Sequence, residues 1–196
     1  MRRVTIHQAP GPKNSLCYWT SYVNPLRVCL NFTIIYLCRF IPFLGLKNSL
    51  YRIVGIKIGK NVSVGLMAMF DVFFPQLITV GDNSVIGYNT TVLAHEFLIR
   101  EWNTGEVIIG RDVMIGANTT IIAGVSIGDA AVVSAHSLVN HDVSPRTFVT
   151  KPSPRRLGGT SKPPRPATPA GPIARRSPRP ATDGRSATGA PIPPRP

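Results

Sequence analysis

His95 is the residue of this sequence with the clearest potential for acid–base chemistry. An imidazole changes its protonation state near neutral pH, so a histidine held on a rigid scaffold can accept a proton from a substrate hydroxyl. Glu96 follows it directly, and Arg100 and Trp102 lie a few residues further on. We expect residues 96–108 to project as a loop that presents these three side chains to a substrate beside His95.

A six-residue repeat predicts the scaffold that positions this site. An aliphatic or aromatic residue returns every six positions in three runs, and a small or β-branched residue usually follows it four places later. The repeating positions are Ile58, Val64 and Phe70; Val80, Ile86 and Val92; and Ile109, Ile115, Ile121, Ile127, Val133 and Val139. Three hexapeptides, each a short strand and a turn, form a triangular coil whose aliphatic residues stack inward. We expect a mainly β protein, a parallel β-solenoid of about four coils over residues 58–79, 80–97, 109–126 and 127–144.

A second regularity marks the corners of these coils. Three places after the repeating residue stand types that tolerate left-handed backbone angles, namely Asn61, Asn83, Asn89, Asp112, Asn118, Gly124 and Asp142. His95 and His136 occupy the same slot, so each also fits a purely structural corner. His95 differs because Glu96 follows it in a slot that is otherwise small or apolar. A carboxylate cannot enter a dry core without a partner, so we expect the chain to leave the coil at Glu96 and return near Ile109.

The residues before the repeat fall into two parts. Residues 1–23 predict an irregular extension. We expect two helices in residues 24–55. The first carries an apolar stripe and ends near Pro42, and the second runs from Leu46 to Val54 and is closed by Gly55. The stripe consists of Leu26, Leu30, Ile34, Leu37, Ile41 and Leu44. The uncharged run between Arg27 and Arg39 is too short for a helix that spans a membrane. The two helices therefore either cap the solenoid or rest on a membrane surface through residues 26–46.

Charge and composition narrow the function class. The chain has 22 Lys and Arg against 9 Asp and Glu, a formal net charge of +13. Residues 158–196 hold seven of those basic residues and one acidic residue. This Pro/Arg-rich tail contains no aromatic residue, and we expect it to be disordered. The remaining positive charge forms no dense run, so we expect no nucleic-acid partner.

The cysteines and the N-terminus indicate a location. Cys17, Cys29 and Cys38 lack metal-ligand spacing, so we expect reduced thiols and no metal. No early apolar core follows Met1, which argues against a cleavable signal peptide. We expect a cytoplasmic protein, placed at the inner face of the membrane if residues 26–46 rest on a bilayer.

The tract from Ile115 to Val139 resembles the last coils of the hexapeptide-repeat acyltransferases. This family includes the maltose and galactoside O-acetyltransferases and related glycan O-acetyltransferases. The turn from Val92 to His95 is similar to the family's histidine-bearing turn, and the segment from Lys151 to Leu157 resembles the basic Pro-rich segment that closes its domain. The resemblance implies a left-handed parallel β-helix, here at residues 56–157.

The same resemblance implies a chemistry. Members are homotrimers, and acetyl-CoA or another acyl-CoA would lie between neighbouring subunits. His95 would be the general base that takes a proton from a hydroxyl of a sugar, glycan or glycolipid acceptor, and backbone N–H groups would stabilise the oxyanion. The sequence offers no covalent nucleophile, so direct O-acyl transfer is expected. Carried over position by position, the CoA-binding residues are Ala117, Ala135, Asn140, His141, Arg155 and Arg156.

Two other functions stay open at this point. A zinc hydratase similar to the γ-class carbonic anhydrases would need three histidines across a subunit interface. His136 and His141 have the five-residue spacing of that family's pair and His95 could be the third, but they occupy different slots of the coil. A non-enzymatic trimeric scaffold would bind through its helices and tail, and its groove would have no function.

Overall fold

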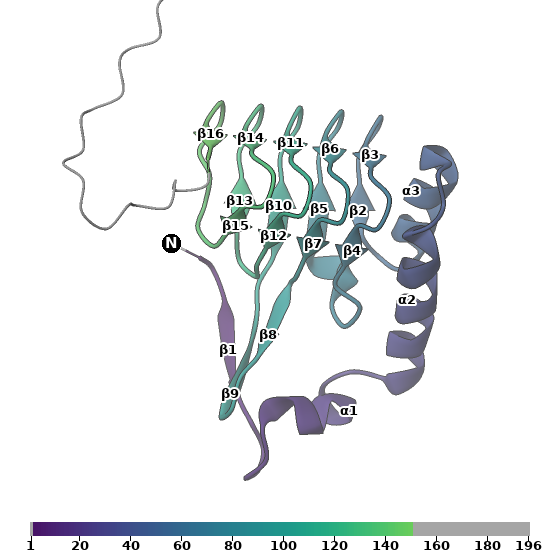
Figure 1. The fold of residues 1–196 in the computed structure, drawn as a ribbon. Helices are drawn as coiled ribbons and strands as arrows, with labels where there is room; N and C mark the ends of the chain where they lie inside the picture. Colours follow the sequence, from purple (N-terminus) through teal and green to yellow (C-terminus); the bar gives the residue numbers. More distant parts are fainter. Residues whose placement is uncertain (1, 151–196) are drawn as a thin grey trace, which may run out of the picture. The chain divides into compact units, whose positions relative to one another are not determined.

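Short strands stack into three parallel sheets in the computed structural model, which describes residues 2–150 (Figure 1). The first sheet contains β2 (Lys57–Ile58), β5 (Ile78–Val80), β10 (Val107–Ile109) and β13 (Ser126–Ile127). The second contains β3 (Ser63–Val64), β6 (Val85–Ile86), β11 (Met114–Ile115), β14 (Val132–Val133) and β16 (Phe148–Val149). The third contains β4 (Met69–Phe70), β7 (Thr91–Val92), β12 (Thr120–Ile121) and β15 (Leu138–Val139). Each strand pairs with the equivalent strand of the next coil, so the parallel β-solenoid is confirmed.

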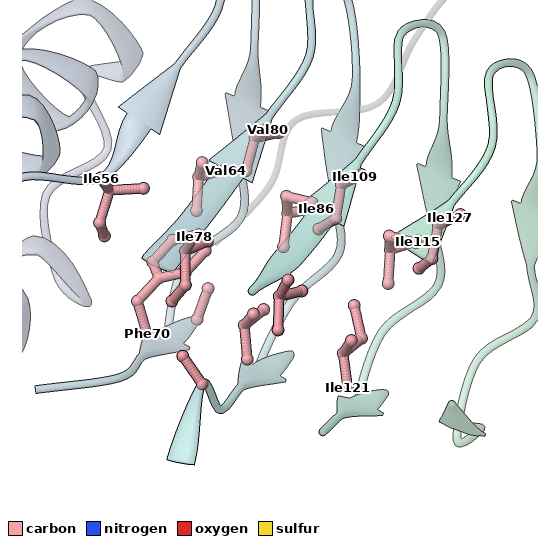
Figure 2. Close-up of a cluster of buried hydrophobic side chains, with 14 of the residues drawn as sticks. Ile56, Val64, Phe70, Ile78, Val80, Ile86, Ile109, Ile115, Ile121 and Ile127 are labelled. Carbon is pink, nitrogen blue, oxygen red and sulfur yellow. The ribbon is translucent and has the colours of Figure 1, made fainter. Parts of the chain in front are cut away.

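The repeating aliphatic residues form the core of this solenoid. All of them are buried, and they stack in register, as Val80 does between Ile58 and Ile109. Figure 2 shows side chains of successive coils pointing into the space between the strands, among them Val64, Ile86 and Ile115. The periodicity therefore predicted both the strands and the face that each strand buries.

Left-handed corners connect the strands, mostly where the sequence places them. Asn61, Asn83, Asn89, Asp112 and Asn118 have φ angles between 52° and 57°, and Gly124 has a φ of 79°. The prediction for Asp142 is wrong, because its φ is not positive. Its carboxylate instead accepts a hydrogen bond from the backbone N–H of Ser126 in the preceding coil.

The N-terminal residues are more ordered than expected. The prediction of an irregular extension at residues 1–23 is wrong, because this segment contains β1 (Thr5–Gln8), the 3₁₀-helix η1 (Ser15–Tyr18) and α1 (Trp19–Tyr22). The strand β1 pairs with β9 (Glu101–Thr104), which in turn pairs with β8 (His95–Phe97), so that three antiparallel strands project from the solenoid (Figure 1). A strand this short carries little sequence signal, and the edge of β9 supplies the partner that orders it.

Two longer helices cover the first coil. The first, α2 (Pro25–Cys38), begins at Asn24, whose side chain accepts hydrogen bonds from the backbone N–H groups of Leu26 and Arg27. The second, α3 (Leu44–Ile53), begins two residues earlier than predicted, and Gly55 follows it with a φ of 103°. The helices pack on the first coil, as the cap interpretation requires. Among residues 2–150, no helix combines the length and the apolar character that a membrane span needs.

The face of α2 that packs on the solenoid differs from the predicted stripe, of which Ile34 is partly buried against the core. Its buried residues are Val28, Asn31, Ile35 and Cys38, whereas Leu26, Leu30 and Leu37 are exposed. Burial raises the pKa of the Cys38 thiol to about 11, while Lys47 of α3 partly opposes this shift. Lys47 is itself buried, its ammonium donates to the carbonyls of Val64 and Gly65, and burial lowers its pKa. Apolar residues occupy both faces of α2, so helical spacing alone does not distinguish the buried face.

Replacing Ile115 by alanine tests the inward stacking. Ile115 is 1% exposed and its strand neighbour Met114 is 53% exposed. We expect Ile115→Ala to lower the free energy of unfolding by about 2–5 kcal/mol, because a cavity remains in a column that cannot collapse. Met114→Ala should change it by less than about 1 kcal/mol. Urea unfolding at one fixed protein concentration measures both, and equal losses would contradict the assigned strand faces.

Candidate functional site

Two interruptions of the repeat lie side by side on the third parallel sheet. Phe70 on β4 pairs with Val92 on β7, so the residues that follow these two strands leave the solenoid at the same corner. After Phe70 the chain runs through an insertion that ends in the 3₁₀-helix η2 (Pro75–Leu77). After Val92 it enters the β8–β9 hairpin. This arrangement brings Asp71 and His95 together, with 2.5 Å between Oδ2 and Nδ1.

The Asp71 carboxylate is fully buried and held by four donors. Its Oδ1 accepts hydrogen bonds from the backbone N–H groups of Phe73 and Phe74, at 2.8 and 3.0 Å. Its Oδ2 accepts from the backbone N–H of Ala94 at 2.7 Å and from His95 Nδ1. These bonds compensate for the loss of water around the carboxylate and fix its position.

His95 has a defined orientation and an apolar surrounding. A carboxylate only accepts hydrogen bonds, so the proton of the neutral imidazole lies on Nδ1 and the lone pair lies on Nε2. The side chain of His95 is 13% exposed. Its ring contacts those of Phe73, Phe74 and Phe97, at centroid distances of 4.9, 5.9 and 4.6 Å. This geometry suits a general base in a largely water-excluded site.

His95 and His136 differ in backbone conformation. His95 begins β8 and has no positive φ, so its placement in a left-handed corner slot is wrong. The coil ends at Ala94, whose carbonyl accepts a hydrogen bond from the N–H of Gly105, the residue that follows β9. His136 has a φ of 57° and is a corner residue, as its slot predicts.

The predicted loop at residues 96–108 overlaps the β8–β9 hairpin, but the chain leaves the coil one residue earlier, at His95, and returns two residues earlier, at Val107 of β10. The three candidate residues of this loop have different environments. Glu96 forms an ion pair with Arg2 at 2.8 Å. The carboxylate would have had no such partner inside the apolar core. Arg100 is exposed where the hairpin turns. Trp102 is buried and stacks on His7 and Tyr22, with centroid distances of 4.1 and 4.4 Å. Trp102 also lies beside Phe74 and Phe97, with centroid distances of 5.6 and 6.1 Å, so it supports two of the three rings that surround His95.

The residues assigned to CoA lie at two corners of the solenoid. Ala117 and Ala135 are equivalent residues of successive coils, since the carbonyl of Ala117 accepts a hydrogen bond from the N–H of His136. Asn140 and His141 are exposed and hydrogen-bonded to each other after β15, on the same sheet as β7 and two coils from it. Arg155, Arg156 and the tail at 158–196 lie outside the described residues.

The three histidines considered for zinc have separate partners. His95 contacts Asp71, His136 lies 3.3 Å from the amide of Asn118, and His141 contacts Asn140. Within residues 2–150, no three or more His, Cys, Asp or Glu side chains are grouped so that they could hold a metal ion.

Asp71 is the component that the sequence analysis missed. It stands one residue after a repeating position, at the start of the first interruption. Because stacked coils place Phe70 beside Val92, an acidic residue after Phe70 and a histidine soon after Val92 must project from the same corner. The register of the repeat was therefore a sufficient signal, had both interruptions been aligned.

The fold and this site define a class of protein: a parallel β-solenoid with an aspartate–histidine pair at the corner where two insertions leave the coils. Residues 106–139 match the sequence family described as the hexapeptide repeat of succinyl-transferase. The chain is 52% identical over 150 residues to the protein named "Putative acetyltransferase YvoF" of Bacillus subtilis (strain 168). This alignment covers 76% of this chain and 87% of that protein. The chain therefore belongs to the hexapeptide-repeat acetyltransferases, and the resemblance found in its sequence is confirmed.

Two solved structures share the fold. The hexapeptide-repeat acetyltransferase VCA0836 of Vibrio cholerae O1 biovar eltor, complexed with acetyl-CoA, has a TM-score of 0.54 and 24% identity over 63% of this chain and 81% of that one. A galactoside acetyltransferase in complex with coenzyme A has a TM-score of 0.50 and 22% identity over 63% of this chain and 76% of that one. At these identities the likeness concerns the fold.

Asp71→Asn tests how the carboxylate orients His95. An amide at position 71 can still accept from Phe73 N–H, but its NH₂ group would face the donors of Ala94 and His95. We expect His95 to change tautomer, so that its proton moves from Nδ1 to Nε2. Nitrogen chemical shifts of ¹⁵N-histidine-labelled protein report the tautomer. Asp129→Asn, at an exposed corner, is the control, and an unchanged His95 tautomer in Asp71→Asn would refute the orienting role.

Proposed function

We propose that this protein transfers an acetyl group from acetyl-CoA to a hydroxyl of a sugar or glycan, with His95 as the general base. The observation that carries the proposal is the Asp71–His95 pair, because it leaves Nε2 as a proton acceptor on a rigid scaffold. Asp71 acts as a positioning residue that fixes the tautomer and stabilises the imidazolium. The family membership supplies the type of reaction.

The proposed reaction is a direct transfer in which His95 carries the proton. The acceptor hydroxyl donates its proton to Nε2 of His95 while its oxygen attacks the thioester carbonyl carbon. The carbon–sulfur bond then breaks, CoA leaves as the thiolate, and the proton on Nε2 passes to that sulfur. The products are the O-acetyl ester and free CoA. Phe73, Phe74 and Phe97 limit the access of water, which would otherwise compete as the acceptor.

The CoA site is proposed to lie between subunits of a homotrimer with left-handed coils, as the family resemblance implies. Ala117 and Ala135 offer a small-residue corner, along which an extended pantetheine chain can approach the backbone. Asn140 and His141 offer exposed polar groups on the corner that also carries His95 two coils away. Parallel strands are about 4.8 Å apart, so this separation is on the order of 10 Å. Arg155 and Arg156 are proposed to contact the CoA phosphates.

The acceptor site is proposed to lie beside the β8–β9 hairpin. Arg100 is exposed where the hairpin turns and is free to approach a polar acceptor, whereas Glu96 is held by Arg2. A sugar also fits the aromatic surface formed by Phe97 and its neighbours, because apolar faces of sugar rings pack on aromatic rings. Maltose, galactosides and oligosaccharide fragments are therefore the first acceptors to test.

His95→Ala tests the general base. The variant should lose about 10²–10⁴-fold in kcat/KM, because no other group replaces Nε2. Thiol release from acetyl-CoA is followed with the acceptor panel, and the esters are identified by mass spectrometry. His136→Asn serves as the matched control, since it preserves a residue suited to the left-handed corner. Equal rates in His95→Ala and wild type would eliminate the mechanism.

A further inference from the structure

Helices α2 and α3 expose an extensive apolar surface, which we call the helical face. On α2 it consists of Leu26, which is 81% exposed, together with Leu30 and Leu37. Phe43 before α3, and Leu46 and Ile53 on α3, are exposed as well, and we include them in the helical face. The opposite side of α2 packs on the solenoid, so the helix is apolar on both sides. A helix of this kind needs a second apolar environment besides the core.

An exposed aromatic row accompanies these leucines. Phe32, Tyr36 and Phe40 follow one another at helical spacing, with centroid distances of 5.5 and 5.6 Å. The guanidinium of Arg39 lies 5.7 Å from the centre of the Tyr36 ring. Aromatic rings and arginines with apolar stems are the residues that suit the boundary between water and lipid.

Charge selects the chemistry of the partner. Residues 1–70 contain nine Lys and Arg and no Asp or Glu, and the first acidic residue of the chain is Asp71. Lys47 is buried against backbone carbonyls, and the guanidinium of Arg52 donates to the carbonyls of Ile58 and Gly59. Arg27, Lys57 and Lys60 are exposed on or next to the helices. Asp82 of the next coil accepts a hydrogen bond from the backbone N–H of Lys60, but the helices themselves carry cations and no anion. Such an apolar surface is complementary to anionic lipid headgroups.

We propose that the helical face docks the protein on an anionic phospholipid bilayer. The helices would lie in the plane of the interface, with the leucines and aromatic rings below the headgroups and Arg27 among the phosphates. Two copies facing each other through this surface would instead bring like charges together. The inference is independent of the proposed acyl transfer, because it concerns where the protein resides and needs no turnover.

Vesicle sedimentation of the full chain tests the proposal. Wild type should pellet with vesicles of phosphatidylcholine and phosphatidylglycerol, and at least about tenfold less with phosphatidylcholine alone or in 1 M salt. The triple variant L26Q/L37Q/F40Q should lose binding to the anionic vesicles, while its thermal melt stays unchanged because all three positions are exposed. V85Q removes an exposed apolar side chain from β6 and should bind like wild type.

Each other outcome would overturn the docking surface. Wild type that stays in the supernatant shows no affinity for anionic lipid. Binding that is equal in the triple variant assigns the affinity elsewhere, for example to the basic residues after Gly158. A triple variant that changes the sedimentation coefficient in ultracentrifugation without lipid shows that the helical face joins copies of this chain. Thiol release measured without vesicles separates these results from a failure of the acetyltransferase mechanism.

Discussion

The inward stacking of one aliphatic residue every six positions is the constraint on which the rest of this structure depends. Each coil must place its side chains directly beside those of the next coil, so extra residues cannot be accommodated within a strand. They leave at a corner, where the chain already turns away from the core. Both insertions of the described chain follow strands of the third parallel sheet, after Phe70 and after Val92. The rule that makes the scaffold regular thus also decides where irregular residues meet.

Asp71 shows how one buried carboxylate can serve both insertions. It accepts the N–H groups of Phe73 and Phe74 within its own insertion and the N–H of Ala94 at the start of the other. Removing that carboxylate would leave buried backbone donors without partners, so it is needed for local structure whatever the chemistry. Besides the N–H of Ala94, Oδ2 accepts a second hydrogen bond from Nδ1 of His95. Positioning of the imidazole therefore follows from a group that the fold already requires.

The sequence predicted those parts of the molecule that repeat. Strand positions, buried faces and most left-handed corners follow from the period of six, because each has the same cause in every coil. The excursion after His95 was also predictable, since Glu96 could not occupy a core slot. Two features were not: β1 is ordered by its pairing with β9, and the packed side of α2 is chosen by its contacts with the solenoid. Both depend on partners distant in the chain, which no local pattern of residues encodes.

The helix α2 connects the proposed docking surface with the acid–base pair. Its packed side includes the buried Asn31, whose side-chain amide donates a hydrogen bond to the carbonyl of Val72 at 3.0 Å. Val72 follows Asp71, so the position of the helix constrains the insertion that carries the carboxylate. Leu26, Leu30 and Leu37 occupy the opposite side of the same helix. A bilayer bound there would lie one helix diameter, about 10 Å, from the support of Asp71. The proposed docking and the proposed acyl transfer, taken together, would place the acceptor hydroxyl close to a membrane surface.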